Sequence, residues 1–231
     1  MPPTWLVVVS WCALAVAAVS AAAILYDIHG RGYRQHMRVM EAVWPVTALY
    51  AGPLANLAYR RWGRPRTSRW MRKHDTDEPP EKPGWATTAV GVSHCGAGCT
   101  LGDILAATVI FLLGLELAGE TLFAEYVGDY VAAVSLGLLF QYFAIAPMRG
   151  LGVRKGIVAA AKADILSLTA FEVGMFAWMA VTALVLFPAP HHVRPDSPVY
   201  WFMMQVGMLL GFLTACPVNA WLIRRGVKEA M

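Results

Sequence analysis

The chain has 231 residues, of which 58% are hydrophobic and only 15% are charged. A soluble globular domain carries about a quarter of charged residues, so this composition excludes an ordinary soluble protein. The formal net charge of +4 does not indicate a nucleic-acid partner, because the basic residues gather between apolar blocks, where they set the orientation of membrane proteins.

The apolar residues form six blocks that are long enough to cross a bilayer, which takes about 20 residues of helix. None of the blocks alternates apolar and polar residues as a strand of a membrane β-barrel does. We therefore predict an all-α membrane protein, a bundle of about six transmembrane helices in a single membrane domain over residues 1–231. The predicted spans are 5–26, 40–59, 101–118, 128–146, 165–187 and 200–223.

The segments between the blocks alternate in charge, which predicts how the chain crosses the membrane. Basic residues are dense in segment 60–73 and recur after the fourth and sixth blocks, whereas the segment after the third block is acidic. By the positive-inside rule, this pattern predicts cytoplasmic N- and C-termini in a multi-pass membrane protein. The first loop conflicts with this assignment, because it would lie outside and carries Arg31, Arg34 and Arg38.

The longest polar segment is 60–84, which is basic at its start and rich in proline and acidic residues at its end. Such a composition cannot bury a core and predicts a disordered cytoplasmic loop. Its basic half is expected to lie against anionic lipid headgroups, so the lipid bilayer is the first partner that the sequence implies.

The most specific feature combines a histidine, two thiols and a carboxylate in the run Ser-His-Cys-Gly-Ala-Gly-Cys-Thr-Leu-Gly-Asp over residues 93–103. These side chains bind soft or borderline metal ions or carry out thiol redox chemistry. His94, Cys95 and Cys99 supply two or three soft ligands, enough for copper(I) in linear or trigonal geometry. The alternative is that both cysteines are small apolar residues that pack at glycine-mediated helix contacts.

Two glycines of this run, Gly96 and Gly98, predict a break in the chain before the third span. Thr100 and Asp103 then fit a capping box at the cytoplasmic start of that helix. The partial positive charge of a helix N-terminus stabilises a nearby thiolate, which favours a metal or redox role for the thiols. Asp103 is on this interpretation either a helix cap or part of an ion path.

Ionisable and sulfur-containing residues inside the predicted spans extend this hypothesis. Ionisable groups are costly in a bilayer and are functional candidates by default. Glu172 lies about two turns into the fifth span, with Met175 and Met179 on its helical face. With Asp103 and Met208 they are predicted to form a path for a soft cation or a proton. Alternatively, Glu172 pairs with a buried cation or hydroxyl group and the methionines fill the core.

Other polar residues are assigned by their distance from the span ends. Cys216, in the cytoplasmic half of the sixth span, is the predicted further metal ligand beside His94, Cys95 and Cys99. Asp129 and Asp164 fall at span ends and are expected to be solvated. Two predicted periplasmic loops carry side chains that suit reception of copper from outside, with simple solvation as the alternative: His29, His36, Met37, Met40, His191 and His192.

Four stretches together resemble an uncharacterised bacterial family of polytopic membrane proteins, a domain-of-unknown-function family. They are the run over 93–103 and the stretches 141–150, 168–176 and 217–223. The likeness extends over residues 85–231 and implies a multi-pass protein of the bacterial cytoplasmic (inner) membrane. Members often occur near copper-handling proteins, but the family has no settled activity, so the resemblance implies membership rather than a function. Members often have an aromatic residue at the position of Cys216, so the resemblance does not imply that Cys216 is a ligand.

Three functions fit these features. The first is binding or transport of a soft metal ion, with copper(I) as the ion and a metallochaperone or a membrane complex as the implied partner. The second is a membrane thiol oxidoreductase in which Cys95 and Cys99 cycle between dithiol and disulfide. The third is a structural or assembly subunit of a membrane complex. The first is our prediction, so a transporter or metal-handling protein is expected rather than an enzyme, with no cofactor besides the metal ion.

Overall fold

The computed structural model describes residues 2–150 and 152–228; for residues 144–149 and 163 it describes the backbone but not the side chains. The described residues form helices joined by loops, and their one β-type pairing is an isolated bridge between Leu117 and Glu120. Five helices are long and apolar enough to cross a membrane: Thr4–Gly30, Gly84–Leu113, Thr121–Phe143, Asp164–Leu186 and Pro198–Arg224. The protein is therefore all-helical, with five helices of membrane-spanning length in the described part.

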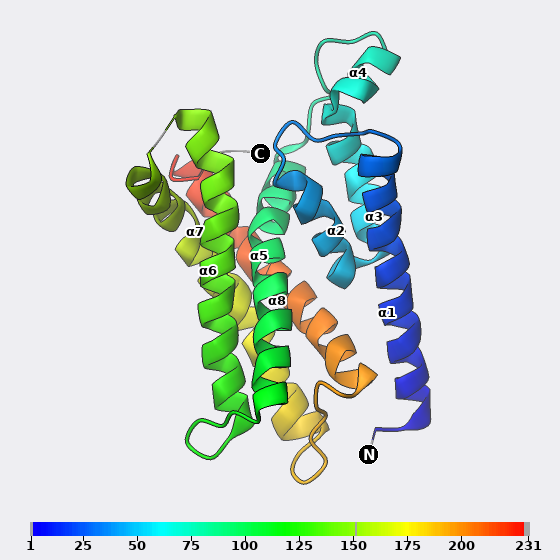
Figure 1. Cartoon of the computed structure of the whole chain (residues 1–231), viewed down its shortest axis with the longest axis vertical. Coiled ribbons are helices and arrows are strands. Elements are labelled where there is room, and N and C mark those ends of the chain that lie inside the picture. Colours follow the sequence, from blue (N-terminus) through cyan, green and yellow to red (C-terminus); the bar gives the residue numbers. More distant parts are fainter. Residues whose placement is uncertain (1, 151, 229–231) are drawn as a thin grey trace.

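The helices follow the chain in a simple order (Figure 1). Helices α5 to α8 run alternately up and down and pack against one another, while α1 lies at the side of this group. Their bounds are α1 Thr4–Leu25, α2 Met40–Ala51, α3 Pro53–Ala58, α4 Ser68–Lys73, α5 Gly84–Leu113, α6 Thr121–Arg149, α7 Val153–Val181 and α8 Pro198–Arg224. Short π- or 3-10-helical segments, η1 Tyr26–Gly30, η2 Tyr59–Gly63, η3 Arg64–Arg66 and η4 Thr182–Leu186, continue or connect them.

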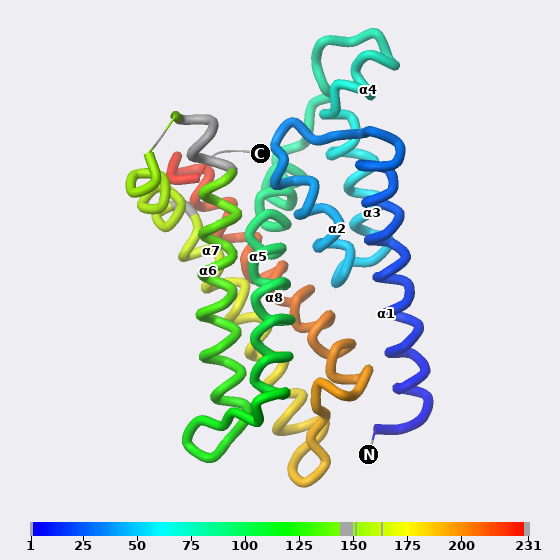
Figure 2. Tube along the Cα trace, viewed as in Figure 1, coloured from blue at the N-terminus to red at the C-terminus, as the bar shows by residue number. Residues whose placement is uncertain are grey.

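The predicted second span over 40–59 does not cross the bundle. It turns back at Gly52, whose φ of 53° and ψ of −130° lie in a region open to glycine but not to residues with a side chain. A Cβ at Gly52 would lie 4.0 Å from Val16, in the middle of α1. The Tyr59 hydroxyl donates to Asp27 at 3.0 Å, beyond the end of α1. Helices α2 and α3 thus form a hairpin that enters and leaves at one end (Figure 2).

This hairpin changes the predicted topology. The predicted count of about six spans is not confirmed: five helices of the described residues have spanning length, and the 40–59 block, although long enough to cross, contains the Gly-Pro turn. Helix α1 begins at one end of the bundle and α8 ends at the other (Figure 1). The prediction that both termini lie on the same side of the membrane does not fit this arrangement.

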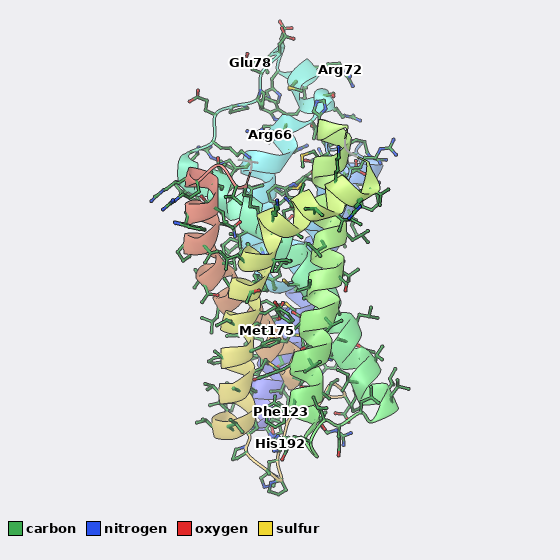
Figure 3. The ribbon with its side chains drawn as sticks, turned by 90° about the vertical axis from the view of Figure 1, so that its left-hand side faces the viewer. Arg66, Arg72, Glu78, Phe123, Met175 and His192 are labelled. Atoms are coloured by element: carbon green, nitrogen blue, oxygen red, sulfur yellow. The ribbon has the colours of Figure 1, made fainter. Side chains whose placement is uncertain are left out.

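Basic residues gather at one end of the bundle, which we call the basic end; the end with loops 114–120 and 187–197 is the far end. The basic end carries loop 31–39, segment 60–83, the start of α7 and the end of α8. Among the described side chains, Arg194 is the one Lys or Arg in the far-end loops. Arg66 and Arg72 mark the basic end and His192 the far end in Figure 3. With the hairpin, loop 31–39 lies at the same end as the other basic segments, so its arginines no longer conflict with the charge pattern of the remaining loops.

The same arrangement separates the histidines that were predicted to lie together outside. His29 and His36 belong to the basic end, whereas His191 and His192 belong to the far end. At the basic end, the Asp27 carboxylate also forms an ion pair with the Arg64 side chain at 3.1 Å. Segment 60–84 includes η3 and α4 in its first half, and its disorder in solution stays a prediction.

Helix α5 runs through the whole cysteine motif without a break. The predictions of a break at Gly96 and Gly98, of a capping box and of thiols at a helix N-terminus are wrong. The Thr100 hydroxyl donates within the helix to the Gly96 carbonyl at 2.7 Å. The glycines serve packing instead: a Cβ at Gly98 would lie 2.6 Å from the Gly137 Cα atom on α6. Small residues of this kind let membrane helices approach closely.

Candidate cation path between helices α5 to α8

Buried ionisable side chains line the contact between α5, α6 and α7. On α5, Cys95, Cys99 and Asp103 repeat every four residues and therefore lie along one face of the helix. All three are fully buried. On α7, Asp164 and Glu172 are eight residues apart and equally buried. The structure thus brings two predicted site residues, Asp103 and Glu172, to the same buried region as the thiols.

The first group of these side chains, which we call the inner cluster, lies at the basic end and consists of Cys95, Asp164, Ser167, Asn219 and Lys228. The Lys228 ammonium donates to an Asp164 carboxylate oxygen at 2.6 Å and to the Cys95 sulfur at 2.7 Å. The Cys95 thiol also lies 2.8 Å from the same Asp164 oxygen. Ser167 donates to the Cys95 sulfur at 3.4 Å and accepts from Asn219.

Lys228 follows the end of α8 and is buried with its ion-pair partner. Burial by itself lowers the pKa of this lysine, but Cys95 and Asp164 raise it, and the net shift is upward. The Lys228 side chain therefore remains an ammonium ion inside the protein. It supplies the positive charge that balances the buried Asp164 carboxylate.

The second group, the central cluster, consists of Cys99, Asp103, Asp129 and Glu172. Both carboxylate oxygens of Asp103 are buried without a hydrogen bond to a described residue, and the Glu172 carboxyl group is buried beside the Cys99 thiol. Asp103 interacts electrostatically with Glu172 and Asp129, and Cys99 with Glu172. Three carboxyl groups in an apolar bundle cannot all carry charge at so little distance without a counter-ion. The central cluster therefore has to hold protons or a cation.

A cavity of about 350 Å³ lies at the far end, between the α5–α6 loop and the loop before α8. Glu116, Glu120, Glu125, Met179 and His192 are among its lining residues. Thr182 and Tyr200 also line it, and both of their hydroxyl groups are buried. The cavity is thus lined by three glutamates together with other polar side chains.

Glu125 connects this cavity to the interior. It lines the cavity, is 8% exposed, and interacts electrostatically with Asp129, one helical turn further along α6. Asp129 in turn interacts with Asp103 and Glu172 of the central cluster. From the far end to the basic end, titratable groups therefore follow one another from Glu125 through the central cluster to the inner cluster.

The remaining predicted ligands do not join the thiols. His94 is fully buried, and its ring lies against Phe140 with ring centroids 6.4 Å apart. Both ring nitrogens of His94 are buried. Cys216 is partly buried on α8 and packs against the apolar core. Within the part of the chain that the structure describes, no three His, Cys, Asp or Glu side chains are grouped to hold a metal ion.

The predicted methionines have different surroundings. Met175, at mid-height in Figure 3, is fully buried and faces α8, where a Cβ at Gly207 would meet its side chain at 3.3 Å. Met208 is buried and lines an apolar pocket with Trp201. Met179 alone among these three lines the far-end cavity. Met175 and Met208 are therefore core residues in this structure, and Met179 is the one placed along the path.

Sequence reasoning missed several members of the path. Asp129 and Asp164 were expected to be solvated at span ends, but they are 3% and 0% exposed. Lys228 was counted only as an orientation signal. The four-residue spacing of Glu125 and Asp129 was the available signal for the far-end part, because it places both on one helical face. Nothing in the sequence pairs Lys228 with Asp164, which lies 64 residues earlier.

A comparison with protein families identifies the part of the chain that holds these buried clusters. The family model described as Domain of unknown function (DUF4396) matches residues 84–228. The chain belongs to this family. The matched region begins with α5 and ends at Lys228, so the family's domain contains both clusters, whereas α1 to α4 precede it. No curated protein and no solved structure matches the chain.

Proposed function

We propose that this member of the family moves a cation across the membrane between α5, α6 and α7, with copper(I) as the first candidate ion. The observation that carries the proposal is the pair Asp103 and Glu172. Both carboxyl groups are fully buried and interact with each other, and Asp103 has no described hydrogen-bond partner. Because ionisable groups in this situation need a proton or a cation, the pair is suited to receive one and release it.

Sulfur ligands support a soft ion as the cargo. Cys99 lies beside Glu172, and Cys95 lies one helical turn further toward the basic end. Two thiolates are enough to hold copper(I) in linear geometry. Met179 offers a thioether at the far-end cavity. An ion that enters at the cavity meets carboxylates first and thiols afterwards.

Proton movement is the second candidate, and a specific observation favours it. Glu125 and Asp129 precede the thiols along the path and interact electrostatically with each other. Carboxyl groups in succession within a membrane are typical of proton relays. A proton path and a copper path share Glu172, but only the copper path needs Cys99.

We expect the thiols to hold one copper(I) ion per chain. Because a hydroxyl is a poor ligand for a soft ion, Cys99→Ser and the double variant Cys95→Ser/Cys99→Ser should each lose most of the bound copper. Metal analysis of the purified proteins after anaerobic loading measures this. The exposed Cys12 is the matched control, and Cys12→Ser should keep the wild-type copper content.

Transport in liposomes separates the candidates. Protein-containing vesicles with a copper(I) indicator inside should show uptake that Cys99→Ser abolishes, whereas a pH dye inside should report proton flow that Cys99→Ser spares. Equal copper binding by wild type and the double-serine variant, with proton flow intact, makes the proton the cargo. No flow of either ion in folded wild-type protein contradicts the proposal and favours a structural subunit. Reductant-dependent labelling of Cys95 and Cys99 favours the oxidoreductase instead.

The charge distribution supports an orientation in the bacterial cytoplasmic membrane. Positive residues in short loops favour the cytoplasmic side. With the hairpin in place, the basic end is assigned to the cytoplasm, and the far-end cavity opens to the outside. The N-terminus then lies outside and the C-terminus inside, so a cation that enters at the cavity moves inward.

This topology predicts the behaviour of reporter fusions. A reporter that is active only outside the cytoplasm should be silent when fused after Arg72 and active when inserted after Gly119, in the α5–α6 loop. A reporter that fluoresces only in the cytoplasm should be dark at the N-terminus and bright at the C-terminus. The same signal at both termini would restore six crossings, and outside activity after Arg72 would reverse the orientation.

A further inference from the structure

The inner cluster is a cation site that already holds a cation supplied by the chain. We propose that Asp164, Cys95 and their neighbours bind a single monovalent cation, that the Lys228 ammonium occupies this site in the resting protein, and that an arriving ion displaces it. The function of the site as the last station of the path rests on the proposed transport, but its occupancy is testable without transport.

The ligands around the ammonium group support this site. One carboxylate oxygen of Asp164 and the Cys95 sulfur contact the Lys228 nitrogen at 2.6 and 2.7 Å. The second Asp164 oxygen and the Asn219 side-chain oxygen are buried, and neither has a described hydrogen-bond partner. Two oxygen atoms of the site are thus still available as ligands when the lysine is bound. A carboxylate, a sulfur and an amide oxygen suit one soft monovalent ion.

Burial explains why the site is not left without a cation. Cys95, Asp164, Ser167 and Asn219 are all 0% exposed, and Lys228 is 2% exposed. A buried carboxylate that loses its counter-charge must take up a proton or another cation. Lys228 and an incoming metal ion are therefore mutually exclusive occupants, since both neutralise the same Asp164 charge.

The attachment of Lys228 allows such an exchange. The residue lies four positions beyond the end of α8, after a turn at Gly226 with a φ of 68°. Its backbone is held by a hydrogen bond from its own amide to the Leu222 carbonyl at 3.3 Å and by that of Val227 to the same carbonyl at 3.0 Å. Beyond these bonds, the ammonium sits on a flexible four-carbon stem. Its release therefore requires movement of the segment after α8 and of its own side chain, and no backbone hydrogen bond of α5 or α7 has to break.

A purely structural role makes a different prediction. If Lys228 only anchors the end of α8, it stays buried whether or not a metal ion is present. If it is a displaceable cation, filling the site with another ion exposes it. Acetylation of lysine requires a free, accessible amine, so the acetylation rate of Lys228 distinguishes the two.

The first experiment uses the full-length wild-type protein in detergent, treated with acetic anhydride and analysed by mass spectrometry. Without metal, Lys228 should react at least tenfold more slowly than the exposed Lys155. With copper(I) or silver(I) added in slight excess over the chain, Lys228 acetylation should rise several-fold while that of Lys155 stays constant. Lys228 that remains protected with metal bound at Cys95 would overturn the proposal.

The second experiment probes the emptied site through Cys95, in protein whose other three cysteines are serine. Lys228→Met should speed the reaction of Cys95 with a small cationic methanethiosulfonate at least tenfold, and more than its reaction with a neutral reagent of similar size. Lys228→Arg should remain slow, and Lys155→Met is the matched control. Equal acceleration by both reagents would mean loosened packing and would refute the site.

If Lys228→Met does not fold because Asp164 is left unpaired, a double variant still tests the site. In Asp164→Asn/Lys228→Met the buried pair is neutral, so the protein should fold, and the preference for the cationic reagent should disappear. A preference that survives there contradicts the role of Asp164. If copper exposes Lys228 in protein that transports no ion, the proposed site is supported and the proposed transport function is refuted. Transport with Lys228 protected throughout would refute the site alone.

Discussion

Glu172→Gln should lower the rate of cation uptake into liposomes at least tenfold, in protein that expresses and purifies like the wild type. The amide keeps the shape of the side chain but neither releases a proton nor neutralises a cation. Because the interactions described for Glu172 are with Cys99, Asp103 and Asp129, the substitution should leave no buried cation unpaired. Vesicle uptake of copper(I) and of protons, measured on the same preparation, checks both candidate cargoes.

The control for this variant is Glu78→Gln, an exposed carboxylate in the segment before α5, labelled at the basic end in Figure 3. It should transport like the wild type. Asp103→Asn should behave like Glu172→Gln, since the two carboxyl groups act on one ion. If Glu172→Gln transports normally, the central cluster is structural. If the variant is lost from the membrane while Glu78→Gln is not, Glu172 has a structural partner and the transport role fails.

The second large effect is expected from the contact between α5 and α6. A Cβ at Gly102 would lie 2.5 Å from the Ala133 backbone nitrogen, closer than atoms approach without moving a helix. Gly102→Ala should therefore destabilise the protein by about 1–3 kcal/mol, and Gly102→Leu should prevent a monodisperse, folded preparation. Thermal unfolding in detergent should show a lowered midpoint for the alanine variant, and size-exclusion chromatography should show aggregation of the leucine variant.

Gly91 provides a matched control on the same helix. A Cβ there meets nothing within 4 Å, so Gly91→Ala should be neutral or stabilise α5 by up to about 1 kcal/mol through its better helix propensity. An equal loss of stability in both alanine variants would mean that helix propensity or detergent sensitivity, rather than the helix contact, sets the effect. A stable Gly102→Leu protein would contradict the close packing of α5 on α6.

These expectations connect packing with transport. Glycines at 98 and 102 bring the α5 backbone against α6, so the α5 face with Cys95, Cys99 and Asp103 is closed off from lipid. Polar side chains inside a membrane are tolerated when they face the interior of a bundle in this way. The glycines that were predicted to interrupt the helix thus hold together the wall of the proposed path.

Composition and apolar blocks were enough to predict the fold class. Long apolar stretches must become helices in a bilayer because every backbone amide needs a partner there, and five of the six predicted blocks correspond to helices of spanning length. The positive-inside pattern also identified segment 60–73 and the end of α8 as one side. For the candidate site, the sequence indicated Cys95, Cys99, Asp103 and Glu172, since thiols and carboxyl groups are rare enough in membrane helices to stand out.

Other features depended on tertiary structure, because they rest on contacts between distant residues or on a backbone angle that composition does not reveal. The 40–59 block has the length of a span, and only the conformation of Gly52 turns it back. Gly96 and Gly98 favour a break locally, but packing against α6 and α7 keeps α5 continuous. Lys228 and Asp164 meet because the first half of α7 packs beside the end of α8 at the basic end of the bundle. Because both side chains are buried there, each is the counter-ion of the other.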